Sequence, residues 1–188
     1  MEILWAILII LVIFIIVFAA TYNSLVKLNE RVNEAWSDIT VQLKRRSDLI
    51  PNLVETVKGY TKHEDDAIKA VSDARAKMMG ARSVANTAEA DKTVTGALSR
   101  LLAVSEAYPE LKANENFKQL SAELSDTEDK IQAARRFYNA GAKELNTKIK
   151  TFPTNLINNM IGHFKLRDYY EVSESEKAKI ESTPEVKF

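Results

Sequence analysis

The chain has 188 residues with 26 basic and 26 acidic side chains, so its formal net charge is zero. This balance argues against a general nucleic-acid binder, which is steered to its target by excess positive charge. The length suffices for one domain with its own core in addition to a membrane anchor. Glycine and proline are scarce, alanine, glutamate, lysine and leucine are abundant, and no alternating strand pattern occurs. We therefore predict an all-α protein.

The first predicted element is a membrane anchor. Residues 3–20 are eighteen consecutive apolar residues without a charge, glycine or proline, and as a helix they span ~27 Å, about one bilayer core. A cleaved signal peptide is the alternative, but it needs a basic start and a shorter apolar run, whereas Glu2 precedes this run. Trp5 and Tyr22 lie ~25 Å apart along such a helix, where aromatic rings favour the two headgroup levels. We predict a transmembrane helix at 1–21, with the lipid bilayer as its partner.

Basic residues indicate on which side of the membrane the following domain lies. None precedes residue 3, and those nearest after the run are Lys27 and Arg31, followed by Lys44, Arg45 and Arg46. Because positive flanks favour the cytoplasm, we predict a short external N-terminus and a cytoplasmic domain. The absence of cysteine fits a reducing cytoplasm without excluding a periplasm.

A long amphipathic helix is predicted to follow the anchor without interruption, at about 22–60. Its apolar positions recur every three or four residues from Leu25 to Tyr60, which is the period of one buried helix face. Pro51 lies within this pattern, yet the apolar positions keep their phase across it. We expect Pro51 to kink the helix and not to end it.

The next stretch leaves two interpretations open. Thr61 and Glu64 have the spacing of a capping box, which predicts a helix at about 62–82. The apolar period then fades, and Asn86 resembles a new N-cap for a helix at about 87–108. The stretch forms either two collinear halves of one rod or two separate helices.

Asn114 is predicted to cap a helix at 115–152, which has the most regular apolar period in the chain. Gly141 within it indicates either the close approach of a neighbour or a tolerated cost of about 1 kcal/mol. After Pro153, a short amphipathic segment at 153–164 is interpreted as a lid, a partner surface or a membrane-surface helix. Its apolar face contains Leu156, Ile157, Met160, Ile161 and Phe164.

The C-terminal tail, 171–188, is polar and is predicted to be mostly disordered. Val186 and Phe188 alternate near its end and present two apolar side chains on one side of an extended segment. They are candidate docking residues, for the same domain or for another copy of the chain, with a frayed terminus as the alternative.

The predicted lengths define an architecture for residues 22–170. Three segments of about forty residues each, 22–60, 62–108 and 115–152, can pack up, down and up over their full length. We predict an elongated antiparallel bundle of three to four helices, continuous with the N-terminal transmembrane helix, because isolated amphipathic helices cannot bury their apolar faces.

The sequence shows no pattern that indicates catalysis or a cofactor. A di-metal centre in a helical bundle requires two Glu-x-x-His pairs, but Tyr60 and Met160 occupy the positions three residues before His63 and His163. The acidic residues 64–66 beside His63 could bind a cation, although such residues are common in a first helical turn. A cysteine nucleophile, Gly-x-Ser-x-Gly and a phosphate-binding glycine loop are absent. We predict no enzyme activity, no cofactor and no metal.

The strongest positive cluster consists of Lys44, Arg45 and Arg46, followed by Asp48. One interpretation is a solvated face that pairs with acids of another helix, such as Glu123, Asp126, Glu128 and Asp129. The other is an interaction surface for a partner or for anionic lipid. Arg46 differs because it lies on the apolar face. It either extends its charge to solvent or forms a partly buried pair that specifies the register of the helices.

The run from Val41 to Tyr60, VQLKRRSDLIPNLVETVKGY, strongly resembles the LemA family, which also includes a magnetosome membrane protein. Further similar positions are Tyr22-Asn23, Ala35-Trp36, His63-Glu64, Tyr108-Pro109, Leu111-Lys112-Ala113, Tyr138-Asn139 and Phe152-Pro153. The resemblance covers nearly the whole chain up to about Tyr170. It implies a bacterial-type membrane protein with one N-terminal transmembrane helix, a very short external N-terminus and a cytoplasmic helical bundle, and it implies no catalytic residues.

Together these features predict a membrane-anchored, non-enzymatic scaffold or interaction protein that self-assembles and helps to organise a membrane or envelope. The alternative is an accessory or regulatory subunit of a membrane enzyme such as a protease. The resemblance suggests this alternative, since members are often encoded near membrane proteases. The expected partners are the bilayer, further copies of the chain (a homo-oligomer) and, for the alternative, a membrane protein; nucleic acid is not expected.

Overall fold

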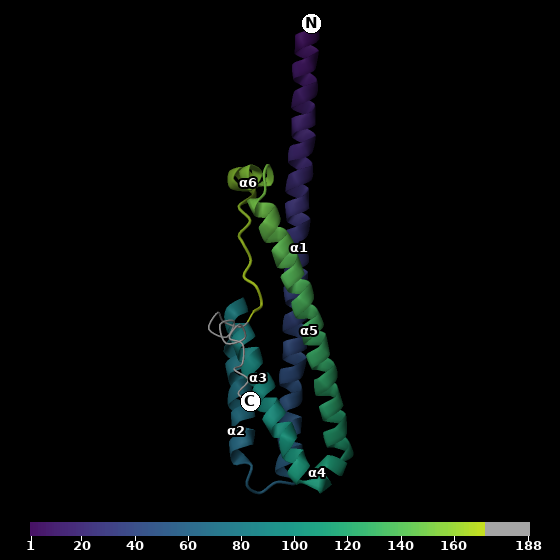
Figure 1. Cartoon of the computed structure of the whole chain (residues 1–188), viewed down its shortest axis with the longest axis vertical. Helices are drawn as coiled ribbons and strands as arrows, with labels where there is room; N and C mark the ends of the chain where they lie inside the picture. Colours follow the sequence, from purple (N-terminus) through teal and green to yellow (C-terminus); the bar gives the residue numbers. More distant parts are fainter. Residues whose placement is uncertain (172–188) are drawn as a thin grey trace, which may run out of the picture. The chain divides into compact units, whose positions relative to one another are not determined.

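The computed structural model describes residues 1–171, and every regular element within them is a helix, which confirms the predicted all-α class. The elements, drawn in Figure 1, are α1 (Glu2–Lys58), α2 (Asp65–Gly80), α3 (Val84–Val104), η1 (Ser105–Ala107), α4 (Pro109–Ala113), α5 (Glu115–Lys150), α6 (Thr154–Ile157) and η2 (Asn158–Gly162). The predicted tail from residue 172 on, with the candidate docking residues Val186 and Phe188, lies outside the described residues.

The chain forms two compact units. The first unit consists of Met1–Ser37 and Arg136–Tyr169, and the second unit consists of Asp38–Arg135 together with the described residues from Tyr170 on, which end at Glu171. Because α1 and α5 each cross a boundary between these ranges, each of the two helices contributes one part to either unit.

α1 is one helix that contains both the apolar run and the amphipathic stretch predicted to follow it. The large apolar side chains at 3–17 are all at least 45% exposed, whereas from Leu25 on a buried position recurs every three or four residues. The helix continues through Pro51, as predicted, and ends at Lys58. By length and composition α1 can cross a membrane.

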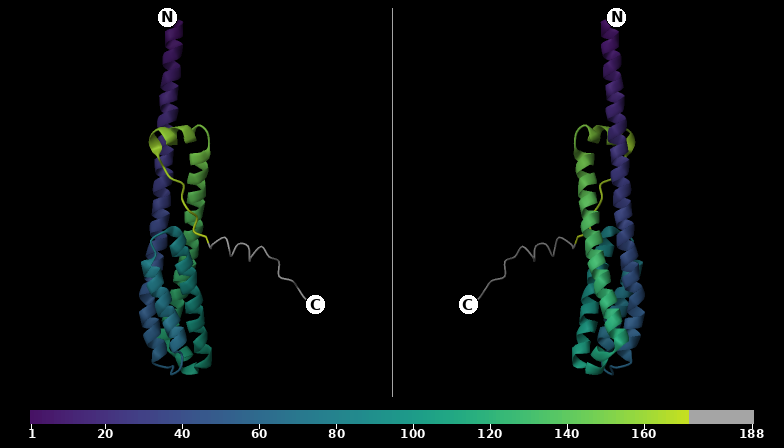
Figure 2. Two further views of the ribbon diagram at one scale, coloured as in Figure 1. Left: turned by 90° about the vertical axis from the view of Figure 1, so that its left-hand side faces the viewer. Right: turned by 90° about the vertical axis from the view of Figure 1, so that its right-hand side faces the viewer.

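In the first unit, α1 and α5 lie side by side and run in opposite directions (Figure 1 and Figure 2). Contacting residues follow one another in reverse order along the two helices: Ser24 with Lys148, Arg31 with Glu144, and Trp36 with Tyr138. A Cβ atom placed on Gly141 would lie 3.3 Å from Val32 Cγ2. Of the two explanations for this glycine, the close approach of a neighbour is therefore correct.

In the second unit, the stretch 62–108 contains a hairpin of two separate helices, α2 and α3. α2 begins at Asp65 without a side-chain capping bond at Glu64, so the predicted capping box does not form. α3 is capped by Ser83, whose Oγ accepts a hydrogen bond from Asn86 N at 3.2 Å, and Asn86 is therefore not the N-cap. The interpretation of this stretch as two collinear halves of one rod is wrong, because the chain turns between the two helices.

α5 and the segments after it follow the predicted order with small shifts. Asn114 caps α5, as predicted, because its Oδ1 accepts a hydrogen bond from Phe117 N at 3.0 Å. α5 ends at Lys150, and the predicted segment 153–164 consists of α6 and the single π-helical turn η2. Residues 163–170 continue without regular structure.

Candidate functional site

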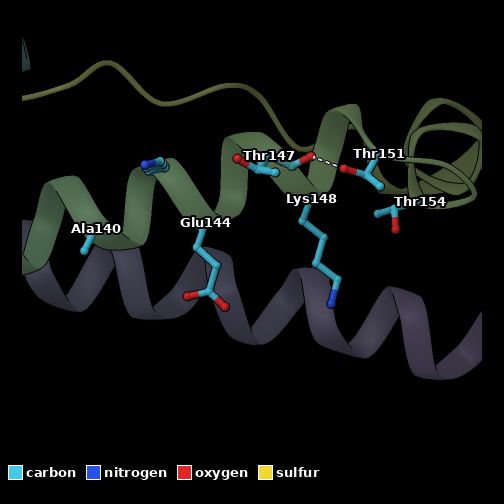
Figure 3. A pocket seen from close by; sticks show the side chains of 7 residues that line it. Ala140, Glu144, Thr147, Lys148, Thr151 and Thr154 are labelled. Atoms are coloured by element: carbon cyan, nitrogen blue, oxygen red, sulfur yellow. Dashed lines mark hydrogen bonds between the residues drawn. The ribbon is translucent and has the colours of Figure 1, made fainter.

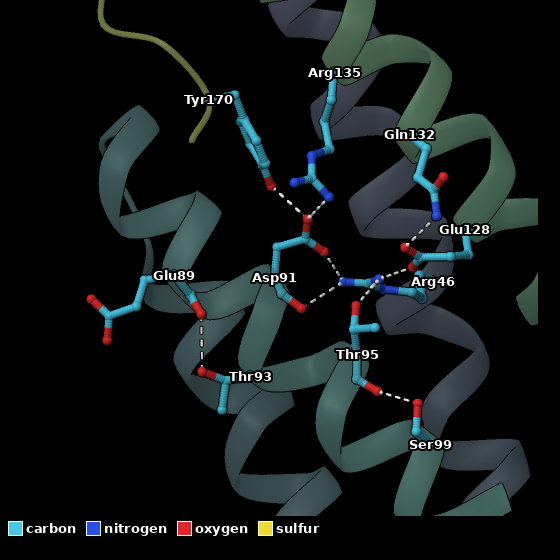
Figure 4. Close-up of polar contacts among 10 residues, drawn as sticks. All are labelled: Arg46, Glu89, Asp91, Thr93, Thr95, Ser99, Glu128, Gln132, Arg135 and Tyr170. Atoms are coloured by element: carbon cyan, nitrogen blue, oxygen red, sulfur yellow. Dashed lines mark hydrogen bonds and ion pairs between the residues drawn. The ribbon is translucent and has the colours of Figure 1, made fainter. Parts of the chain in front are cut away.

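Arg46 of α1 and Asp91 of α3 form the centre of a buried charge network in the second unit (Figure 4). Their side chains are 2% and 3% exposed, and Arg46 Nη2 donates a hydrogen bond to Asp91 Oδ1. Arg46 Nη1 donates to Glu128 Oε2 of α5 at 2.6 Å and to Thr95 Oγ1 of α3 at 3.0 Å. Arg46 therefore forms internal ion pairs instead of extending its charge to solvent.

Asp91 is also bound from its other side. Tyr170 Oη donates to Asp91 Oδ2 at 2.8 Å, and Arg135 Nη1 lies 3.7 Å from the same carboxylate oxygen. The guanidinium carbon of Arg135 lies 5.0 Å from the centroid of the Tyr170 ring, which is a cation–π distance. Burial, and then the neighbouring Asp91 carboxylate, raises the pKa of Tyr170 far above its usual range. The phenol is therefore a protonated donor at neutral pH.

The buried charges of this network compensate one another. Both oxygens of Asp91 have partners, and the second oxygen of Glu128 accepts a hydrogen bond from Gln132 Nε2 at 3.4 Å. Arg46 and Arg135 balance the two carboxylates in formal charge, so the cost of burying the ions is offset within the network. The arrangement is suited to fixing the alignment of α1, α3 and α5 in the second unit, and not to proton transfer with a substrate.

The sequence marked Arg46 as unusual, but it did not indicate its partner Asp91 in α3 or Tyr170, which binds Asp91 from the chain after η2. Asp91 lies three residues before the buried Val94, so it continues the series of buried positions of α3. A charged residue at such a position could have been predicted to be buried from the helical period alone. Tyr170 lies 79 positions from Asp91, and no local pattern connects the two residues.

The other members of the predicted basic cluster are exposed on α1. Lys44 Nζ lies 2.9 Å from Asp48 Oδ2, one helical turn further on. Arg45 Nη1 lies 3.8 Å from Asp126 Oδ2 on α5. Two of the acids expected on another helix, Asp126 and Glu128, thus do face the cluster. Lys44, Arg45 and Asp48 stay candidates for a partner surface, whereas Arg46 is buried.

The two predicted membrane-interface residues have different surroundings on α1. Trp5 is 63% exposed within the apolar run. Tyr22 packs against Phe164, with the ring centroids 6.1 Å apart. Tyr22 is therefore the place where the apolar run meets the packed part of the first unit. The roles of Trp5 and Tyr22 at the headgroups stay predictions.

An open depression follows α5 in the first unit (Figure 3). It is lined by Ala140, Lys143, Glu144, Thr147, Lys148, Thr151 and Thr154. Lys148 Nζ donates to Ser24 Oγ at 2.6 Å, and Glu144 pairs with Arg31 at 3.6 Å, so two of its three charged side chains bind α1. Within residues 1–171, no group of three or more histidine, aspartate or glutamate side chains is placed to hold a metal ion.

An exposed apolar helix of bilayer length that continues into amphipathic positions, together with an interior whose charges are paired, defines a membrane-associated all-α protein. The sequence profile of the LemA family matches residues 35–188. The chain belongs to the LemA family.

Several relatives match most of the chain. Protein LemA of Metamycoplasma hominis is 29% identical over 182 residues, which cover 91% of this chain and 78% of the relative. Magnetosome protein MamQ 2 of Paramagnetospirillum magneticum is 27% identical over 196 residues, covering 88% and 72% of the two chains. Magnetosome protein MamQ of Magnetospirillum gryphiswaldense is 27% identical over 186 residues, covering 85% and 68%.

Proposed function

We propose that this chain is a membrane-anchored, non-enzymatic scaffold or interaction protein that self-assembles and helps to organise a membrane or envelope. The observation that most supports this proposal is that α1 passes without a break from an exposed apolar run into buried amphipathic positions. Apolar side chains exposed over such a length favour a bilayer over water. The relatives named as magnetosome proteins favour a role in membrane organisation.

We propose three parts along the chain: a membrane anchor at 1–21, a helical region at 22–170 that binds partners, and a C-terminal tail at 171–188. A non-enzymatic role is supported by the chemistry of the interior, because the buried charges of the second unit bind one another. The side chains available to partners are those of exposed pairs such as Lys44 with Asp48.

The helical region is proposed to lie in the cytoplasm, and single cysteines in this cysteine-free chain test that placement. Met79→Cys lies in α2, where Met79 is 60% exposed. It should resist an impermeant maleimide in intact cells and react after lysis, whereas Glu2→Cys should react in intact cells. The reverse labelling would contradict the proposed topology.

Self-assembly is tested by purifying the full chain in detergent, measuring its mass by light scattering and imaging the particles. A large homogeneous assembly is the expected result for a scaffold. A monomer that co-purifies with one membrane enzyme would instead identify the chain as an accessory or regulatory subunit.

A further inference from the structure

The segment formed by α6 and η2 exposes large apolar side chains in the first unit. Phe152, just before α6, is 74% exposed, and Leu156, Met160 and Ile161 are 53%, 70% and 47% exposed. Of the apolar face expected from the sequence, Ile157 is the residue that is buried. Such a gathering of exposed apolar side chains is typical of an interaction surface.

This segment lies beside α1 at the level where the apolar run ends. Phe164, two residues after the end of η2, packs on Tyr22. Tyr22 lies two residues beyond the run, or ~3 Å along the helix. α6 lies crosswise to α1, as Figure 1 and Figure 2 both show. If α1 crosses a bilayer along its own axis, an element that lies crosswise to α1 at this level runs along the bilayer surface. This places α6 and η2 at the surface and not within the hydrocarbon.

The charges at this end of the first unit have one sign. Residues 21–29 of α1 and residues 145–166 contain four lysines and no carboxylate side chain. The lysines are Lys27, Lys148, Lys150 and Lys165. The first acidic residues beyond these ranges are Glu30, Glu144 and Asp168. Exposed apolar side chains among lysines favour the headgroup region of an anionic membrane.

Hydrogen bonds hold the segment in one conformation. Asn158 is buried, its Oδ1 accepts from Phe164 N at 2.9 Å, and its Nδ2 donates to Phe164 O at 3.1 Å. A Cβ atom on Gly162 would lie 2.7 Å from Asn158 Oδ1, so the turn is built around a residue without a side chain. The exposed apolar side chains are thus presented by an ordered element.

We propose that α6 and η2, together with Phe152, form a second membrane contact, which seats the exposed apolar side chains in the headgroup region of an anionic bilayer next to α1. The proposal rests on the membrane anchor of the proposed function. A bilayer is favoured over a protein partner because the segment adjoins the end of the anchor and because the charges around it are all positive.

The test uses the full chain reconstituted into vesicles of phosphatidylcholine and phosphatidylglycerol. Three single-cysteine variants carry an environment-sensitive fluorophore: Met160→Cys in η2, Phe14→Cys in the anchor and Met79→Cys in α2. Lipids with a nitroxide near the carbonyl groups quench a fluorophore at the headgroup boundary, and lipids with a nitroxide deep in the acyl chain quench a fluorophore in the hydrocarbon core. The expected result is quenching by the shallow nitroxide and a blue-shifted emission at position 160, quenching by the deep nitroxide at 14, and neither effect at 79.

The outcomes separate this proposal from the anchor itself. Quenching at 14 without quenching at 160 would overturn the second contact and leave the anchor standing, whereas no quenching at either position would overturn both. A blue shift at 160 without nitroxide quenching would indicate a protein partner and likewise overturn the proposal. Replacing Lys150 and Lys165 together by glutamine should reduce quenching at 160 in these vesicles, and unchanged quenching would overturn the role of the anionic headgroups.

Discussion

The two units bury their polar groups by different means. In the second unit, Arg46, Asp91 and Glu128 are charged side chains from three helices that bind one another. In the first unit, the side chains that bind the backbone of the extended stretch after η2 are neutral. Asn146 Nδ2 donates to the carbonyl of Arg167 at 2.9 Å, and Asn146 Oδ1 accepts from the backbone N–H of Arg167 at 2.8 Å.

This difference shows two solutions to one problem, which is to satisfy every polar group inside a helical protein. A side-chain amide can accept a hydrogen bond from a backbone N–H and donate one to a backbone C=O. It thereby binds the backbone groups of residues 163–169, which have no neighbouring strand to pair with. Asn146 and Asn158 both do this. A buried ion network instead depends on every member, because the loss of one leaves a charge without a partner. The second unit should therefore be more sensitive to single substitutions.

The largest effect is expected for Arg46→Ala. It leaves Glu128 and part of Asp91 without a cation, so the free energy of unfolding should fall by about 3–5 kcal/mol. The exposed Arg45→Ala is the matched control and should cost under about 1 kcal/mol. Urea unfolding of the full chain in detergent, followed by circular dichroism, measures both. Equal midpoints for wild type and Arg46→Ala would show that the network does not stabilise the second unit.

Asn146→Ala should have the next largest effect. It removes two hydrogen bonds to Arg167, and the expected loss is about 1–2 kcal/mol. Hydrogen exchange should accelerate in residues 163–169. Asn116→Ala, an exposed site on the same helix, controls for the replacement of asparagine by alanine. Unaltered exchange in 163–169 after Asn146→Ala would mean that the amide does not hold this stretch.

Gly162→Ala should destabilise the first unit by about 1 kcal/mol, because the added Cβ crowds Asn158 and Phe164. Gly96→Ala in α3 should change the free energy of unfolding in the opposite direction. A Cβ atom there would meet nothing within 4 Å, so the gain in helix propensity should stabilise the second unit by about 0.5–1 kcal/mol. Thermal unfolding of both variants should show a lower midpoint for Gly162→Ala and a higher midpoint for Gly96→Ala than for wild type. A higher midpoint for Gly162→Ala would contradict the tight turn.

The smallest effect concerns alkaline pH. The folded-state pKa of Tyr170 is raised, chiefly by burial, so its contribution to stability is complete below the unfolded pKa of about 10 and is lost as the pH rises beyond it. Wild type should therefore lose stability above pH ~10 more steeply than Tyr170→Phe, which has no phenol to ionise there. Tyr169→Phe, at an exposed site, should keep the wild-type slope. Parallel curves for wild type and Tyr170→Phe would refute the buried neutral phenol.

Local patterns in the sequence predicted the features that depend on neighbouring residues. The apolar run, the passage of α1 through Pro51 and the Asn114 cap follow from periodicity and cap chemistry. The caps of α2 and α3 were misassigned, because polar residues at the right spacing occur at more than one position and the turn between the helices selects Ser83. Of the partners of Arg46, Glu128 was among the acids expected on another helix, whereas Asp91 was not predicted, since ion pairs between distant helices have no local spacing.

The unbroken course of α1 past the end of the apolar run also bears on how two copies meet. The helix has no linker between Ala20 and Leu25, so the residues that follow the bilayer cannot tumble independently of it. If the proposed anchor spans the membrane, two chains in one membrane can meet only by lateral diffusion and by rotation about the membrane normal. Much of the orientational entropy that soluble partners lose on association has already been lost on insertion. For the self-assembly proposed above, a contact between copies that is too weak and small for association in solution would therefore suffice at the membrane.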